Sequence, residues 1–194
     1  MKLPDGMPLG AMALRALFAS GAAANPVYVV VRPDDDLQWL RYESGLSGRC
    51  SGSVHIALCP DAARGMSYSI RCGIQAAEAE EPDALLIMLA DQPFVSALHL
   101  KTLASEYMRD QDADYAASIG REGVPMPPVI IGRKLLPQLS RLEGDMGARK
   151  LLQSPGLRGT KVPVRSEAEL LDIDDAEGYR TAAEFFVRQY RESQ

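Results

Sequence analysis

One short apolar run constrains the fold of this chain more than any other feature. Residues 85–90 read Leu-Leu-Ile-Met-Leu-Ala, Asp91 ends the run, and Pro93 follows two positions later. A short run without polar alternation is typical of a strand that is buried on both faces of a parallel sheet. Because Pro93 has no amide hydrogen and favours an extended conformation at Gln92, we expect this strand to stop near Asp91.

The position of Asp91 supports two interpretations. In open α/β sheets the carboxyl ends of the strands border the ligand crevice. A carboxylate there suits Mg²⁺ that is shared with a phosphorylated substrate. On this local pattern alone, a simple cap for the turn into the next helix explains Asp91 equally well.

Segments typical of strands alternate with segments typical of helices along the whole chain. We expect strands at 27–31, 54–58, 85–90, 114–119 and 161–164, and helices at 8–20, 34–43, 65–80, 96–109, 133–140 and 175–191. Residues 127–132 read as an edge strand, because Pro127 and Pro128 would disturb a central ladder. This order predicts an α/β fold: a single domain over residues 1–194, built as a three-layer α/β/α sandwich around a mainly parallel, Rossmann-like sheet.

Composition excludes several classes of protein. The formal net charge of −5 argues against general affinity for nucleic acid or for an anionic membrane surface. The three cysteines are odd in number and show no C-x-x-C spacing, which argues against a disulfide framework or a structural zinc site. The polar start, broken by Pro4, does not resemble a signal peptide, so we expect a cytoplasmic protein. His55 and His99 lack neighbours at metal-ligand spacing, and we expect structural roles for both.

Two further stretches combine polar residues with glycine. Gly65 to Gly73 opens a helix, where Ser67, Ser69 and the free amides of the first turn can hold an anion and Arg71 can reach a phosphate. N-capping by a serine is the simpler alternative. Gly144 to Leu152 carries acid, glycine and base together, as in a salt-bridged cap or a loop that holds a substrate.

A third stretch, residues 170–177, is acidic. Asp172 and Asp174 alternate, so they share a face if the backbone is extended. If this stretch and Asp91 face one crevice, a divalent metal ion between them is the economical explanation.

Four motifs occur in an order that resembles a known family: Gly65-Met66-Ser67-x-Ser69-Ile70, Leu89-Ala90-Asp91-Gln92-Pro93, Gly144-Asp145-x-Gly147-Ala148-Arg149 and Asp172-Ile173-Asp174. The set resembles the MobA-like nucleotidyltransferases, most closely the molybdenum cofactor cytidylyltransferase branch, over residues 2–183. The resemblance implies that CMP is transferred from CTP to molybdopterin, that pyrophosphate is released and that Mg²⁺ is required. A molybdoenzyme or its chaperone is the implied protein partner.

The resemblance also implies roles for individual residues. Asp91 and Lys2 would be catalytic, and Asp91 and Asp174 would bind the metal ion. The implied substrate-binding residues are Gly65, Ser67, Ser69, Arg71, Gln92, Pro93, Asp145 and Arg149.

One departure from the family bears on all of these roles. The family opens with a strand and a glycine-rich loop of the form L-A-A-G-x-S-x-R-M-G that wraps the triphosphate. Lys2 matches the lysine that closes this loop, so by the resemblance the first strand and the loop are absent from this sequence. We therefore expect an apolar slot where that central strand would lie, with unpaired backbone groups that cost about 1–3 kcal/mol each. A longer native chain is the explanation we favour; a catalytically impaired protein, or a slot filled by another segment or chain, are the alternatives. Intact-mass analysis of the natively expressed protein distinguishes them, because a mass of 21.1 kDa would exclude the longer chain.

Two other functions remain open from the sequence. The protein could bind the cofactor and deliver it to a molybdoenzyme without catalysis, or it could use GTP or another acceptor. In the family branch the loop before the edge strand often reads G-x-P or G-H-P, whereas here it reads Gly123-Val124-Pro125-Met126-Pro127, and this departure puts the acceptor in doubt.

Overall fold

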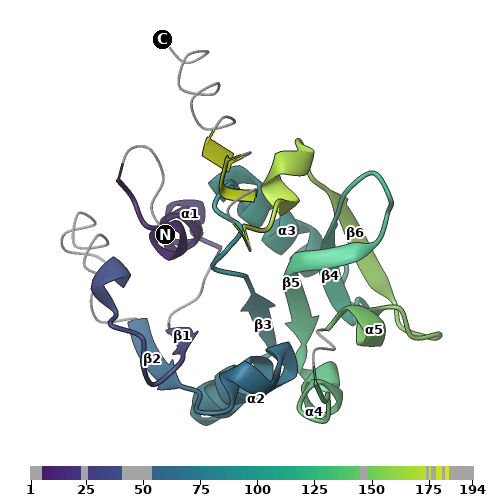
Figure 1. Cartoon of the computed structure of the whole chain (residues 1–194). Helices are drawn as coiled ribbons and strands as arrows, with labels where there is room; N and C mark the ends of the chain where they lie inside the picture. The colour runs from purple at the N-terminus through teal and green to yellow at the C-terminus, as the bar shows by residue number, and fades with distance from the viewer. Residues whose placement is uncertain are drawn as a thin grey trace.

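The computed structural model describes residues 6–22, 26–40, 54–144, 148–173, 175, 178–180 and 182–183. Its strands form two separate sheets (Figure 1). In the smaller sheet, β1 (Val27–Val31) pairs in parallel with β2 (Val54–Leu58). The larger sheet has the strand order β3-β5-β4-β6, with bounds Ala84–Ile87 for β3, Pro125–Gly132 for β5, Tyr115–Ile119 for β4 and Gly159–Pro163 for β6.

Helices cover both faces of these sheets, so the molecule has the three layers predicted from the sequence. On one face, α3 (Ala97–Arg109) packs against β4, β5 and β6, and α1 (Leu9–Ser20) packs against α3. On the other face, α2 (Met66–Ala77) packs against β1, β2 and α4 (Leu136–Leu139), and α5 (Arg149–Leu152) packs against β5. None of the helices in the described ranges is long and apolar enough to cross a membrane.

Alternation of side chains along the strands builds two cores. Ala116 and Ile130 join Leu103 of α3 and Val162 in one cluster. Their strand neighbours Tyr115, Ala117, Val129 and Ile131 point the other way and pack with Ile70 and Ile74 of α2, Leu135, Leu139 and Leu152. Because both faces of β4 and β5 are buried, these strands carry few polar residues, as the pattern of a doubly covered sheet requires.

The larger sheet is mixed, which refines the prediction of a mainly parallel one. The β4–β6 ladder is parallel, but β5 runs antiparallel to both β3 and β4. The reason lies in the connection: five residues, 120–124, join β4 to β5, and a loop this short can join only antiparallel neighbours. Gly123 supplies a φ of +66° in that loop.

The prediction that Pro127–Gly132 is an edge strand is wrong, because β5 lies in the middle of the larger sheet. The register explains how the prolines are tolerated. Ala117 pairs with Val129 but the next residue, Ser118, pairs with Met126, so both prolines fall in an irregularity of the β4 ladder. The β3 ladder uses only residues 129–132 of β5. Neither Pro127 nor Pro128 therefore stands at a position that requires an amide hydrogen for a ladder.

Two other predicted elements are shorter than expected. The strand predicted to reach Asp91 ends at Ile87, so Asp91 lies in a turn four residues beyond the end of β3. The helix predicted over 34–43 is a single 3-10 turn at residues 38–40 in the described part, preceded by Leu37 with a φ of +54°. Residues 41–53 lie outside the described ranges.

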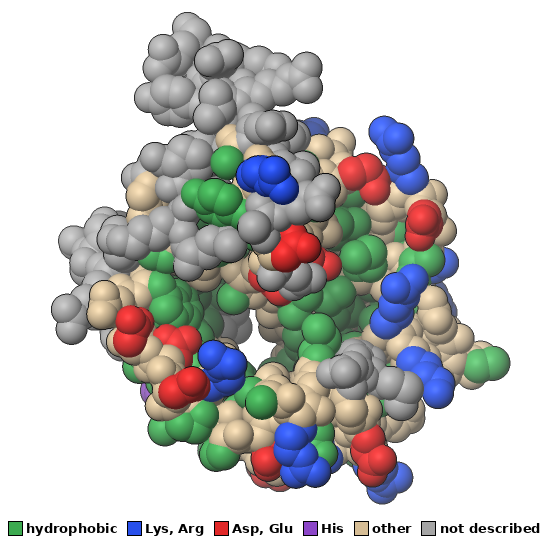
Figure 2. Space-filling view, in the orientation of Figure 1, with side chains coloured by type: hydrophobic (Ala, Val, Ile, Leu, Met, Phe, Trp, Pro, Cys, Tyr) green, Lys and Arg blue, Asp and Glu red, His purple; other side chains and the backbone are tan. Residues whose placement is uncertain are grey.

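The slot expected from the sequence is present. Within the described ranges, β1 pairs only with β2, and β3 pairs only with β5, so each has one strand edge without a ladder partner. The two open edges belong to different sheets, and an opening passes between these sheets in Figure 2. Apolar side chains from both strands, Val27, Val29 and Leu86, still share one cluster with Leu14, Leu17 and Leu100.

This arrangement predicts uneven protection of the backbone. Val129 and Ile131 of β5 are 0% exposed and lie between two paired strands, whereas β1 is paired on one side only. In native-state hydrogen exchange, we expect the bonded amides of residues 129–131 to exchange on the order of 100-fold more slowly than those of residues 27–31. Equal rates would show that the slot does not weaken the smaller sheet.

Candidate active site

Two acidic segments that are far apart in sequence meet beyond the end of β3. The Ile173 amide donates a hydrogen bond to the Asp91 carbonyl oxygen at 3.0 Å. The Gln92 side-chain Nε2 donates to Asp172 Oδ1 at 2.9 Å. The fold therefore brings the turn that carries Asp91 directly beside residues 172–173, as the metal-site hypothesis required.

Gln92 is the buried centre of this junction. Its side chain is 0% exposed, and Pro93 beside it is also buried. Its Nε2 is used by Asp172, while its Oε1 has no hydrogen-bond partner within the described part of the chain. This bond holds the side chain of Asp172 against Gln92, because breaking it would leave the buried Gln92 amide nitrogen unsatisfied.

Asp91 and Asp172, one on each segment of this junction, offer carboxylate oxygens of the kind that Mg²⁺ prefers. Asp91 is half-buried, with its Oδ1 inaccessible, and Asp172 is half-buried. The described ranges contain no group of three or more His, Cys, Asp or Glu residues of the kind that encloses a metal ion. Mg²⁺ is usually held by one or two carboxylates and completed by water and substrate phosphates, so two carboxylates suit it better than they suit a zinc site. Asp174, the second predicted ligand, lies outside the described residues.

A second pair of predicted motifs also meets. The Ser67 amide, in the first turn of α2, donates to the Gly144 carbonyl oxygen at 3.2 Å. Gly65 precedes the helix with a φ of +128°, a conformation that residues with side chains rarely adopt. Ser67 is 0% exposed, and its hydroxyl has no hydrogen-bond partner among the described residues. The two loops predicted to bind substrate are thus neighbours.

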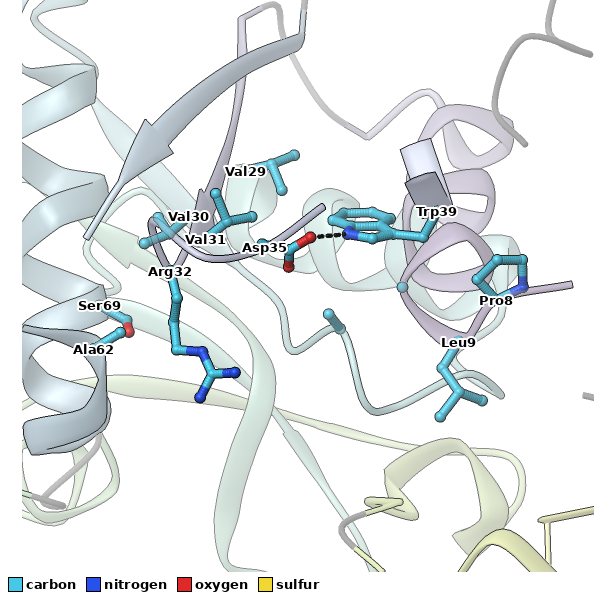
Figure 3. Close-up of a pocket in the computed structure, with 12 residues that line it drawn as sticks. Pro8, Leu9, Val29, Val30, Val31, Arg32, Asp35, Trp39, Ala62 and Ser69 are labelled. Atoms are coloured by element: carbon cyan, nitrogen blue, oxygen red, sulfur yellow. Dashed lines mark hydrogen bonds between the residues drawn. The ribbon is translucent and has the colours of Figure 1, made fainter. Parts of the chain in front are cut away.

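A cavity of about 360 Å³ lies between β1 and the end of β3 (Figure 3). Ser69 and Ala90 both line it, which links the α2 region to the turn of Asp91. Most of the remaining wall is apolar, from Pro8, Leu9, Gly10, Val29, Val30, Val31 and Ala62. Trp39 closes one side, where its Nε1 donates to Asp35 Oδ1 at 3.2 Å and its ring lies against Gly10.

Arg32 is a wall residue of this cavity that the sequence analysis missed. It follows β1 directly and points from the strand end toward the cavity in Figure 3. Its Nε lies 3.4 Å from Asp34 Oδ1, and its side chain is largely exposed. The available signal was its position, because a cation immediately after a buried strand stands at the same kind of edge as Asp91.

The other predicted residues are placed as follows. The Arg71 guanidinium lies 4.4 Å from the centre of the Tyr68 ring, and Arg64 lies 4.5 Å from the same ring, a cation–π arrangement on α2. Arg149 is the exposed first residue of α5. Lys2 and Asp145, predicted as a catalytic and a substrate-binding residue, lie outside the described residues.

His99 and Cys72 have structural environments. Burial lowers the pKa of His99, partly offset by the Glu169 carboxylate, and the ring Nε2 lies 2.8 Å from the Ser118 hydroxyl. That hydroxyl donates to the Pro128 carbonyl, so His99 Nε2 acts as a donor to it. Burial, together with the neighbouring Cys59, raises the pKa of the Cys72 thiol, which makes a reactive thiolate unfavourable there.

Comparison with known proteins bears on the identity of this site. A family model described as "MobA-like NTP transferase domain" matches residues 1–161. The chain is 34% identical over 128 residues to the purine catabolism protein PucB of Bacillus subtilis, an alignment that spans 66% of this chain and 59% of that protein.

Solved structures share the fold. A nucleotidyl transferase from Methanothermobacter thermautotrophicus superposes with a TM-score of 0.72 at 22% identity, covering 97% of this chain and 84% of the other. Rv0371c of Mycobacterium tuberculosis, solved in complex with manganese, gives a TM-score of 0.66 at 20% identity, covering 95% and 90% of the two chains.

The hydrogen bond between Gln92 and Asp172 can be tested by a matched pair of variants. Gln92→Met keeps the approximate volume but removes the donor, so we expect the free energy of unfolding to fall by about 1–3 kcal/mol. Gln75→Met, on the exposed side of α2, is the control and should change stability little. Equal effects of the two substitutions in denaturant titrations would show that Gln92 does not join these segments.

Proposed function

The chain belongs to the MobA-like NTP transferase domain family, and on this premise we propose that it transfers CMP from CTP to molybdopterin. In this reaction a phosphate oxygen of the acceptor attacks the α-phosphorus of CTP. The bond to the β-phosphate bridging oxygen breaks, and pyrophosphate leaves with the electron pair. The observation that carries the proposal is the junction of Asp91 and Gln92 with Asp172 and Ile173.

This reaction requires little covalent chemistry from the protein, because positioning of the substrates and neutralisation of charge supply most of the rate enhancement. Asp91, Asp172 and Asp174 are the residues that would hold Mg²⁺, which when bound neutralises charge on the triphosphate. Ser69, in the first turn of α2, lines the cavity and would supply a neutral hydroxyl donor for an anionic substrate. Arg32 adds a positive charge at the cavity wall.

The relatives support different parts of the proposal. The family description supports a nucleoside triphosphate as the donor. The complex of Rv0371c with manganese supports a divalent cation in this fold. The relative named for purine catabolism supports an acceptor that serves such metabolism, and it leaves CTP and GTP to be separated by experiment.

One observation favours a second function, the binding and delivery of the cofactor without catalysis. The cavity wall formed by β1 consists of the apolar side chains Val29, Val30 and Val31, and in the first turn of α2 the amides of Ser67 and Tyr68 are already bonded to the Gly144 and Gly65 carbonyls. A protein with half of a phosphate site would still bind an acceptor.

Release of pyrophosphate separates the two functions. We expect the purified chain with Mg²⁺, CTP and molybdopterin to release pyrophosphate, and to do so faster than with GTP. Binding of molybdopterin without release from CTP or GTP would leave only the delivery function, and preference for GTP would correct the donor.

A substitution at Asp91 tests its place in the reaction. Asp91→Asn removes the charge without changing the shape, and we expect turnover to fall on the order of 100-fold or more, with the unfolding midpoint nearly unchanged. Asp83→Asn is a matched control, because Asp83 lies just before the opposite end of β3 and its exposed carboxylate pairs with Arg133. Full activity of Asp91→Asn would remove Asp91 from the site.

A further inference from the structure

Glu169 is a buried acid that the proposed reaction does not use. It belongs to the 3-10 helix Glu167–Leu170 and is 6% exposed, whereas Glu167 in the same turn is exposed. Its Oε2 accepts hydrogen bonds from the Ser96 amide at 3.2 Å and from the Ser96 hydroxyl at 2.7 Å. Its Oε1 accepts from the Arg165 amide at 3.1 Å. A carboxylate is retained in such a place only when donors surround it.

The donors place Glu169 at the start of a helix. Ser96 is the N-cap of α3, and its hydroxyl oxygen accepts from the His99 amide at 3.1 Å. The amino-terminal end of a helix favours a negative charge. Glu169 therefore anchors the 3-10 helix to the amino-terminal end of α3 through the same serine that caps it.

This anchor is one end of a longer pairing. We define the paired segments as residues 91–96 and 169–173. At one end, Ser96 donates to Glu169. At the other end, Gln92 donates to Asp172, and Ile173 donates to Asp91. The two segments thus run antiparallel and are joined at both ends.

From this geometry we infer that Glu169 is a positioning residue for the metal site, which rests on the function proposed above. Its carboxylate holds the segment of Asp172 against the turn of Asp91 and keeps the carboxylates from both segments within reach of one divalent cation. Only three residues lie between Glu169 and Ile173, too few to let the far end stay in register once the near end is released.

The sequence offers a matched control on the same turn. Glu167 Oε1 accepts a hydrogen bond from the Arg121 amide at 3.0 Å, so it also joins the 3-10 helix to another segment. That segment follows β4 and is not one of the paired segments. Glu169→Gln and Glu167→Gln therefore remove the same charge from one helix, but only the first is expected to affect the site.

The first measurement needs neither metal nor substrate. In hydrogen exchange of the full chain, we expect Glu169→Gln to speed exchange of the Ile173 amide at least 10-fold and Glu167→Gln to leave it unchanged. Unchanged exchange at Ile173 in Glu169→Gln would overturn the inference. Should Glu169→Gln fail to fold, Ser96→Ala removes one of the three donors and is read by the same criterion.

The second measurement uses Mn²⁺ alone, counted as the free ion by electron paramagnetic resonance. We expect Glu169→Gln to raise the dissociation constant for Mn²⁺ at least 5-fold relative to both the native chain and Glu167→Gln, an effect that loss of stability alone would not produce. Equal Mn²⁺ affinity in the two variants would overturn the role at the metal site. A native chain that binds no Mn²⁺ would instead contradict the proposed function, and the exchange result would still decide whether Glu169 positions the segment.

Discussion

The structure depends on the antiparallel pairing of residues 91–96 with residues 169–173. Three side-chain or backbone contacts hold it: Ser96 with Glu169, Gln92 with Asp172, and Ile173 with Asp91. None of these pairs is local in sequence, and Gln92 and Glu169 are buried while their partners are half-buried. The burial of these two side chains gives the bonds their value, because a buried group that loses its partner costs more than the bond itself contributes. The pairing converts two acidic stretches into one junction.

The slot between the sheets means that the smaller sheet is held less continuously than the larger sheet. The larger sheet is covered on both faces and is paired from β3 to β6. The smaller sheet is attached through α2 and through the shared apolar cluster of Val27, Val29 and Leu86. Side-chain packing without a backbone ladder can hold two sheets together, but it leaves the facing strand edges open to any extended segment that offers donors and acceptors.

The helices and strands with a regular sequence pattern could be predicted from the sequence, because local rules such as periodicity and capping determine them. Gly21 at a φ of +62° ends α1 where expected, and α3 begins at the Ser96 cap. The errors came from tertiary pairing. The apolar run 85–90 indicates burial but not where the ladder ends, and the ladder with β5 ends at Ile87. The prolines of β5 indicated an edge, and only the register with β4 shows why a central strand tolerates them.

The residues of the candidate site also divide into those that the sequence could single out and those that it could not. Asp91, Gln92, Ser67 and Gly144 stand in short motifs with turns beside them, so the sequence could single them out. Arg32 stands in no such motif, and its signal was its position directly after a strand. Glu169 could not be found in the sequence, since one acid in an acidic stretch usually lies on a solvated face. What distinguishes Glu169 is its three donors, and these come from residues 96 and 165, which only the folded chain brings together.

The most direct test of the account is the location of a metal ion in the folded protein. Anomalous diffraction from crystals soaked in Mn²⁺ should show one peak about 2.0–2.6 Å from a carboxylate oxygen of Asp91 and at the same distance from a carboxylate of residues 172–174. A peak at another place, with the Asp91 and Asp172 carboxylates turned away from each other, would contradict it.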